Sequence, residues 1–130
     1  MARDARQPEG AATPRPPYSP VVVSGELVFT AGQVAIDAAG DIVAGGIDEQ
    51  TSQALDNVQA CLGAAGCTLD DVVKTTVFLA DLEDFEAFNR AYASRFAKPY
   101  PARSTVGARL AAGLLVEIEA VARRPAAPQG

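Results

Sequence analysis

The sequence of 130 residues contains no histidine and no tryptophan, and only two cysteines. Without histidine, the chain cannot form a Ser-His-Asp triad, a Cys-His dyad or the usual histidine-containing catalytic zinc site. Any acid–base chemistry must therefore come from Asp, Glu, Lys, Tyr or Cys side chains, or from water. Cys61 and Cys67 match neither a metal-ligand spacing nor a CxxC redox motif. Cys61 is expected on the apolar side of a helix, as a small buried residue.

Positive charge is also scarce, because 11 Lys and Arg residues face 16 Asp and Glu residues, which gives a net charge of −5. This balance argues against a general nucleic-acid binder, which needs a basic surface. No apolar run approaches the roughly 20 residues needed to span a bilayer. The N-terminal sequence also lacks the apolar core of a signal peptide. We therefore expect a cytoplasmic protein with no nucleic-acid or membrane partner.

The length and a hydrophobic content of 48% favour one globular domain. Residues 1–20 are rich in alanine and proline and are expected to form an extended arm without regular structure. A loose tail is expected to begin near Arg124. We place the arm at residues 1–17, the domain at 18–123 and the tail at 124–130.

Hydrophobic spacing predicts two helices. The first is expected to start at Asp48 as the N-cap and to end with Gly66 at the C′ position. The second is expected to be capped by Asp81 and to end before Pro99 and Pro101. Its apolar stripe comprises Leu82, Phe85, Phe88, Tyr92 and Phe96.

Strand-like segments surround these helices. They are residues 21–23, 27–30, 33–36, 42–43, 72–79, 101–106 and 116–122. The simplified order β-β-α-β-α-β-β predicts an α+β fold, with two helices on one face of a mixed sheet. By alternation, the other face carries polar side chains among apolar ones, namely Lys74, Thr76, Glu117 and Glu119. A face of this mixed character is expected to meet another subunit.

The last two predicted strands concentrate charge. One carries Arg103, and the other carries Glu117 and Glu119 on the same side, since strand side chains alternate. This pattern has two explanations: a charged outer face, or a site that binds a small anion.

Several motifs make the sequence resemble the RidA family, also called the YjgF family. PARSTVGARL with LLVEIEAVA carries the resemblance near the C-terminus, and FTAGQ and DVVKTTVFLADLEDFEAFNRAY support it earlier in the chain. The resemblance covers roughly residues 16–123. It implies a chorismate-mutase-like α+β fold and a homotrimer, in which three sheets line a central barrel and ligand clefts lie at the subunit interfaces.

The resemblance also implies a function. Members of the family hydrolyse reactive 2-imino acids and their enamine tautomers to 2-keto acids and ammonia, without a metal or an organic cofactor. Arg103 matches the arginine that binds the substrate carboxylate, and Glu117 matches the acid that holds the attacking water. We expect these two side chains, from adjoining strands, to face each other across a pocket. The residues matching the rest of the substrate site are Tyr18, Ala31, Gly32, Asn89 and Thr105.

Two of these positions depart from the family pattern. Ala31 stands where imine deaminases commonly have a serine, and Thr105 stands where a cysteine is frequent. Because residue 31 has no hydroxyl group, two alternatives stand beside the hydrolysis of small 2-imino acids. The first is a non-catalytic protein that binds or senses small carboxylates, and the second is a pathway-specific deaminase for a larger intermediate. Asn89, Tyr18 and Thr105 also have purely structural explanations, as a backbone-bonded asparagine, a packing residue and a strand former.

Overall fold

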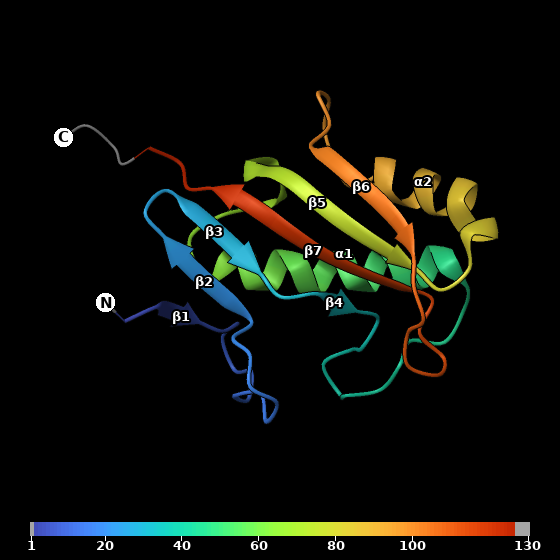
Figure 1. Ribbon diagram of the computed structural model, residues 1–130, viewed down its shortest axis with the longest axis horizontal. Coiled ribbons are helices and arrows are strands. Elements are labelled where there is room, and N and C mark those ends of the chain that lie inside the picture. The colour runs from blue at the N-terminus through green and yellow to red at the C-terminus, as the bar shows by residue number, and fades with distance from the viewer. Residues whose placement is uncertain (1, 127–130) are drawn as a thin grey trace.

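The computed structural model describes residues 2–126 and shows a seven-stranded mixed sheet with helices on one face (Figure 1). Neighbouring strands follow the order β1-β2-β3-β7-β5-β6, and β4 pairs separately with β7. The strands are β1 (Asp4–Arg6), β2 (Val21–Ser24), β3 (Leu27–Thr30), β4 (Gln33–Val34), β5 (Val72–Leu79), β6 (Ala102–Gly107) and β7 (Val116–Arg123). The helices are α1 (Ile47–Gly63) and α2 (Phe85–Ala93), with 3-10 turns η1 (Leu69–Asp71) and η2 (Leu82–Asp84).

The expected α+β architecture is confirmed. The β2–β3 hairpin, the β-branched strand β5 and the two C-terminal strands all form where the sequence predicts them. All neighbouring pairs in the sheet are antiparallel except β5 and β6, which run parallel. The predicted strand at residues 42–43 is reduced to a single bridge between Ile36 and Ile42.

The N-terminal arm is more ordered than predicted. Residues 4–6 form β1, which pairs antiparallel with β2, so the expectation of no regular structure before residue 21 is wrong. The free backbone edge of β2 supplies the hydrogen-bond partners that local propensity does not reveal. Arg6 also reaches the Ala64 carbonyl at 3.3 Å, at the far end of α1. The predicted tail lies outside the described residues from residue 127 onward.

Helix α1 begins two residues earlier than predicted. Gly46 is the N-cap, and its N–H donates to the Glu49 carboxylate at 2.9 Å, so Asp48 is a first-turn residue and not the cap. The C-terminal prediction is confirmed, because Gly66 has a φ of +75°. Cys67 N–H then bonds to the Leu62 carbonyl at 2.9 Å, as in a Schellman motif.

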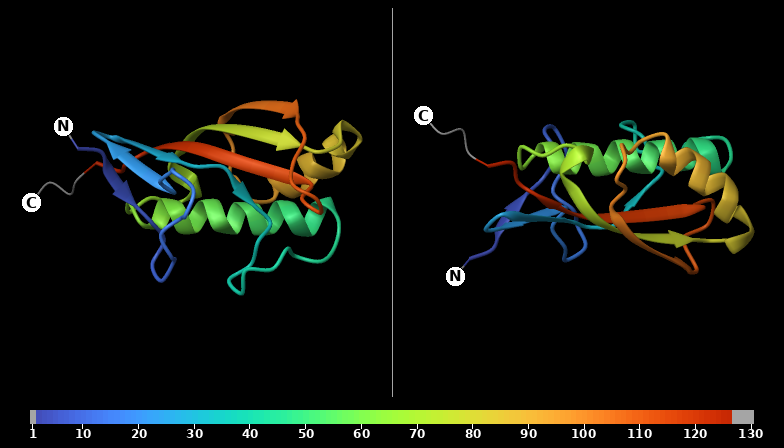
Figure 2. Two further views of the ribbon diagram at one scale, coloured as in Figure 1. Left: turned by 60° about the horizontal axis from the view of Figure 1, so that its bottom comes forward. Right: turned by 90° about the horizontal axis from the view of Figure 1, so that it is seen from above.

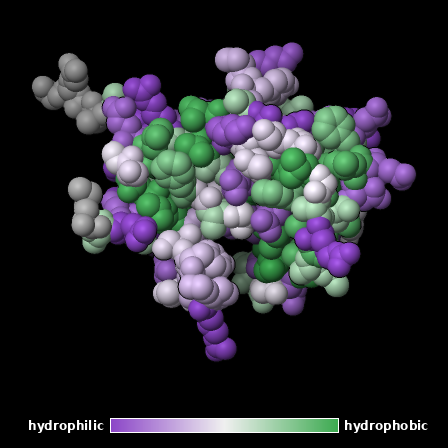
Figure 3. All heavy atoms as spheres, viewed as in Figure 1, coloured by the Kyte–Doolittle hydropathy of each residue, from purple (hydrophilic) through white to green (hydrophobic). Residues whose placement is uncertain are grey.

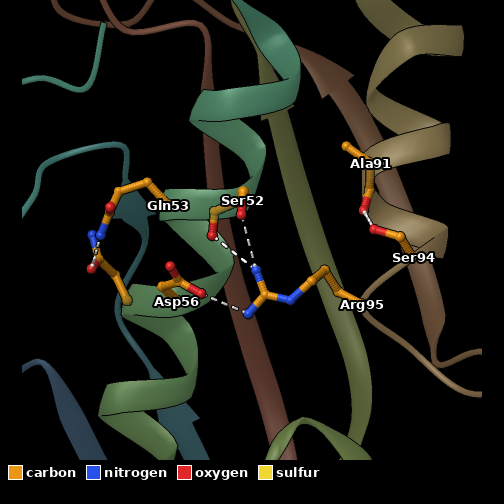
Figure 4. A network of polar contacts seen from close by, with 7 residues as sticks. Ser52, Gln53, Asp56, Ala91, Ser94 and Arg95 are labelled. Carbon is orange, nitrogen blue, oxygen red and sulfur yellow. Dashed lines mark hydrogen bonds and ion pairs between the residues drawn. The ribbon is translucent and has the colours of Figure 1, made fainter. Parts of the chain in front are cut away.

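Helix α2 follows the 3-10 turn η2, which Asp81 caps by accepting the Glu83 N–H at 2.9 Å. The helix ends at Ala93, six residues before Pro99, so the prolines do not themselves terminate it. Arg95, just beyond it, fastens α2 to α1 (Figure 4). Its guanidinium bonds to the Asp56 carboxylate at 2.8 Å and to the Ser52 carbonyl at 3.0 Å.

The hydrophobic core lies between the helices and one face of the sheet (Figure 2). Cys61 is 1% exposed within it, and burial raises the pKa of its thiol to about 11, as expected for a structural cysteine. The opposite, open face of the sheet is mixed, as predicted. Hydrophobic side chains gather over β2 and β3, and polar ones are interspersed over the rest (Figure 3).

Candidate functional site

Arg103 lies on β6, the last strand of the sheet order. In the parallel pairing with β5 it is opposite Thr75, whose side chain is buried on the helix-covered face. Neighbouring residues in register share a face, so the Arg103 side chain also belongs to the helical side. This position brings it over one side of α2.

The guanidinium of Arg103 rests on an aromatic bed, which we define as Phe85, Phe88 and Tyr92 of α2. Its Cζ atom lies 5.0 Å from the ring centre of Tyr92, 5.3 Å from Phe88 and 5.7 Å from Phe85. Each distance is within the range of a cation–π interaction. Nη2 also donates to the Asn89 side-chain oxygen at 2.8 Å. Two kinds of contact therefore hold the plane of the guanidinium.

No carboxylate within residues 2–126 forms an ion pair with Arg103. Asn89 satisfies one of its five N–H groups. The group is half-buried, and a partly desolvated cation without an acidic partner is electrostatically unsatisfied. The arrangement is suited to binding an anion from outside the chain.

The aromatic bed is itself anchored to the sheet. The Tyr92 hydroxyl and the Thr75 hydroxyl are hydrogen-bonded at 2.7 Å. Burial raises the pKa of Tyr92, against smaller opposing effects from Thr75 and from the Arg103 charge. Tyr92 therefore remains a neutral phenol, and its hydrogen bond to Thr75 holds its ring beneath the guanidinium.

Arg103 and Asn89 border a pocket of about 330 Å³. Thr105 follows Arg103 by two residues on the same strand, hence on the same face. Its hydroxyl is buried and has no hydrogen-bond partner among residues 2–126. Arg103, Asn89 and Thr105 are brought together and form what we call the arginine cluster.

Glu117 lies on the open face of the sheet. It is opposite Phe78 of β5 and Val34 of β4, and burial, assisted by the negative charge of Glu119, raises the pKa of its carboxyl group. The carboxylate is pressed against the backbone of Gly32. A Cβ atom built at Gly32 lies 2.8 Å from Glu117 Cδ. Glu117 and Gly32 form what we call the glutamate cluster.

The two clusters do not meet within one chain, which corrects the expectation that Arg103 and Glu117 face each other on adjoining strands. Strand β5 separates β6 from β7. Moreover, Arg103 belongs to the helix-covered face, whereas Glu117 belongs to the open face. Sequence alternation gave the face of each residue within its strand, but not the order of the strands.

The remaining predicted residues are placed apart from Arg103. Tyr18 is 54% exposed and lines a pocket of about 180 Å³ with Arg6 and Gln7 of the N-terminal arm. Ala31 directly precedes Gly32, and its N–H bonds to the Pro20 carbonyl at 2.8 Å. The segment that follows β3 therefore places Ala31 next to the glutamate cluster, of which Gly32 is a part.

Within residues 2–126 no group of three or more acidic or cysteine side chains is arranged to hold a metal ion. The helices of this part of the chain are also too short or too polar to cross a bilayer.

Comparison with known proteins identifies the family. The sequence model of the Endoribonuclease L-PSP family matches residues 9–124. The chain belongs to this family, the RidA (YjgF) family. A RutC family protein of Pyrococcus horikoshii is 47% identical over 88% of this chain and 92% of its own length. The human 2-iminobutanoate/2-iminopropanoate deaminase is 44% identical over 82% of this chain and 79% of its own length.

A solved RidA structure has the same fold. The crystal structure of RidA from an Antarctic Psychrobacter superimposes with a TM-score of 0.85 at 35% identity. The alignment covers 93% of this chain and 99% of that one.

In this RidA-family chain, sequence reasoning missed the aromatic bed. It assigned Phe85, Phe88 and Tyr92 only to a core stripe, although Phe85 is 41% exposed. Their helical spacing next to Asn89 was the available signal, because residues three or four apart share a helix face. The sequence did not show which strand would lie against that face.

Proposed function

We propose that this chain hydrolyses reactive 2-imino acids, and their enamine tautomers, to 2-keto acids and ammonia. The observation that carries the proposal is Arg103, a half-buried cation held by Asn89 and three rings, with no acidic partner among the described residues. The 44% identity to the human protein named 2-iminobutanoate/2-iminopropanoate deaminase supports the same reaction class.

Arg103 binds the substrate carboxylate. A guanidinium is a planar fork that bonds to both oxygens of a carboxylate at once, which lysine does not do. Asn89 and the aromatic bed fix the plane of this fork before the substrate arrives. The bound carboxylate then sets the position of the neighbouring C=N carbon.

A second copy of the chain supplies Glu117. The opposite placement of the two clusters in one chain supports this proposal, together with the open edge of β6 and the mixed open face of the sheet. We propose the chorismate-mutase-like homotrimer, with its sheets lining a barrel and a cleft at each interface. Tyr18, Ala31 and Gly32 then border the cleft from the glutamate side, and Asn89 and Thr105 border it from the arginine side.

Glu117 acts on the water. Its carboxylate accepts a proton from the water as the water oxygen bonds to the carbon of the protonated imine, and returns that proton to the nitrogen. The C–N bond then breaks and ammonia leaves, while the carboxylate takes the proton of the new hydroxyl group to give the keto acid and passes it on to ammonia as ammonium. Acid–base catalysis of this kind contributes about 10²–10⁴-fold, and a carboxyl pKa raised by burial is better matched to neutral pH. No metal or organic cofactor enters this scheme.

The test generates 2-iminobutanoate with a dehydratase in the presence of semicarbazide, which traps the imine. Wild-type protein should divert the flux from semicarbazone to 2-ketobutanoate, and Arg103→Ala should not. Arg123→Ala is the matched control, because that arginine is exposed and pairs only with Glu26 among described residues. Equal behaviour of wild type and Arg103→Ala contradicts the proposal.

One other function remains as an outcome of measurements with the same ligands, and a further one is suggested by the family description. Thermal stabilisation by 2-ketobutanoate without turnover of any imine selects the non-catalytic carboxylate-binding protein, which the missing hydroxyl at Ala31 favours. The family description names an endoribonuclease, but a net charge of −5 gives an RNA substrate little electrostatic support.

A further inference from the structure

The pocket beside Arg103 has apolar as well as polar lining residues. Its lining residues are Asn89, Tyr92, Ala93, Tyr100, Pro101 and Arg103. Arg103 and Asn89 supply the groups that recognise a carboxylate. The other four supply two phenol rings, a methyl group and a proline ring. We call Arg103 and Asn89 the polar end of this pocket, and Tyr100 and Pro101 its aromatic end.

Tyr100 forms the aromatic end without being part of the core. Its side chain is 46% exposed, and the Lys98 ammonium lies 6.0 Å from the ring centre. Tyr92, in contrast, is 4% exposed; its hydroxyl is hydrogen-bonded to Thr75 and its ring lies against the Arg103 guanidinium. Tyr100 is consequently the ring in this pocket with surface available for a ligand.

Within one chain, before the second copy proposed above adds the glutamate side of the cleft, the pocket is also larger than a small imino acid requires. Its volume of about 330 Å³ falls in the range of roughly 300–1,000 Å³ found for sites that bury drug-sized ligands. A substrate with an ethyl side chain, anchored by its carboxylate at Arg103, leaves the aromatic end to water. An apolar side chain bound at this end removes its own apolar surface and that of the pocket from water, which favours binding.

We propose that the pocket selects 2-imino acids with an aromatic side chain, and that Tyr100 is the specificity-determining residue. The carboxylate binds at Arg103, and the side-chain ring packs against Tyr100. This inference rests on the proposed deaminase function and names its substrate class. Aromatic pairs contribute about 0.5–1.5 kcal/mol beyond their burial. That range corresponds to a preference of about 2- to 12-fold over an aliphatic side chain of similar size.

The experiment uses three imines, made in situ by an L-amino-acid oxidase from phenylalanine, leucine and 2-aminobutanoate, with catalase present. Semicarbazide trapping gives kcat/KM for each imine. Wild type should prefer the phenylalanine-derived imine over the leucine-derived one by about 2- to 12-fold. Tyr100→Ala should remove this preference, which is measured as the ratio of kcat/KM for the phenylalanine-derived and leucine-derived imines within the same variant. Tyr100→Phe, the matched control, should keep the preference because the ring remains.

The outcomes separate this inference from the function on which it rests. If wild type hydrolyses no imine, the proposed function fails and the inference fails with it. If 2-iminobutanoate is hydrolysed but the phenylalanine-derived imine is not preferred over the leucine-derived one, the inference alone is overturned. It is also overturned if Tyr100→Ala slows all three imines equally. A melting temperature close to that of wild type checks that Tyr100→Ala is folded.

Discussion

Replacing Gly32 by alanine tests the glutamate cluster through a single methyl group. The new Cβ lies 2.8 Å from Glu117 Cδ and 3.0 Å from Cγ, whereas carbon atoms normally approach to about 3.5–4.0 Å. The Glu117 side chain must therefore move by about 0.7–1 Å. Gly32 does not have a positive φ, so its backbone tolerates alanine. A misplacement of about 1 Å can reduce the rate by about 10²-fold.

We therefore expect Gly32→Ala to lower kcat/KM for 2-iminobutanoate by about 10²-fold in the semicarbazide assay. Gly63→Ala is the matched control, because no atom lies within 4 Å of the Cβ built there. Gly63 is the last residue of α1, far from the glutamate cluster in sequence, and its replacement should retain activity and should not lower stability. If Gly32→Ala stays within about twofold of wild type while remaining folded, the position of the Glu117 carboxylate against residue 32 is not required.

Two further predictions concern stability. Tyr92→Phe leaves the buried Thr75 hydroxyl unpaired and should lower the free energy of unfolding in urea by about 1–3 kcal/mol. The Tyr92→Phe/Thr75→Val double variant should recover most of that free energy. An equal loss in the single and the double variant contradicts the pairing of the two hydroxyls. The folded chain binds the Glu117 proton more tightly than the unfolded chain, because burial and Glu119 raise that pKa above its ordinary value of 4.5. The stability that this carboxyl group contributes is present below pH 4.5 and is lost as the pH rises through its raised pKa. Glu117→Gln should therefore have a higher melting temperature than wild type at pH 7 but not at pH 4. Equal melting temperatures at pH 7 argue against the raised pKa.

Local signals in the sequence were sufficient for most of the fold. The β-branched run of β5 predicted a strand over the residues that form it, 72–79. Gly66 marked the end of α1 because its positive φ is a local requirement. The start of α1 was misplaced because Glu49 caps Gly46 from inside the helix, and an aspartate at residue 48 is equally typical of a first turn.

The features that the sequence did not reveal depend on contacts between distant segments. Strand β1 exists because β2 offers a free edge and α1 offers a carbonyl to Arg6. Similarly, alternation placed Glu117 and Glu119 on one face, but only the strand order shows that Arg103 is on the other. Leu82 was predicted as part of the apolar stripe, yet it is 56% exposed. The pattern of apolar residues does not distinguish buried core positions from exposed ones.

Mixing two inactive variants tests most directly whether one site draws Arg103 and Glu117 from different copies. Arg103→Ala and Glu117→Gln should each abolish imine hydrolysis when prepared alone. When equal amounts are unfolded together and refolded, random assembly gives about one quarter of the clefts an intact Arg103 and an intact Glu117 from neighbouring copies. The account predicts about that fraction of wild-type activity. A folded, mixed assembly that remains inactive contradicts it.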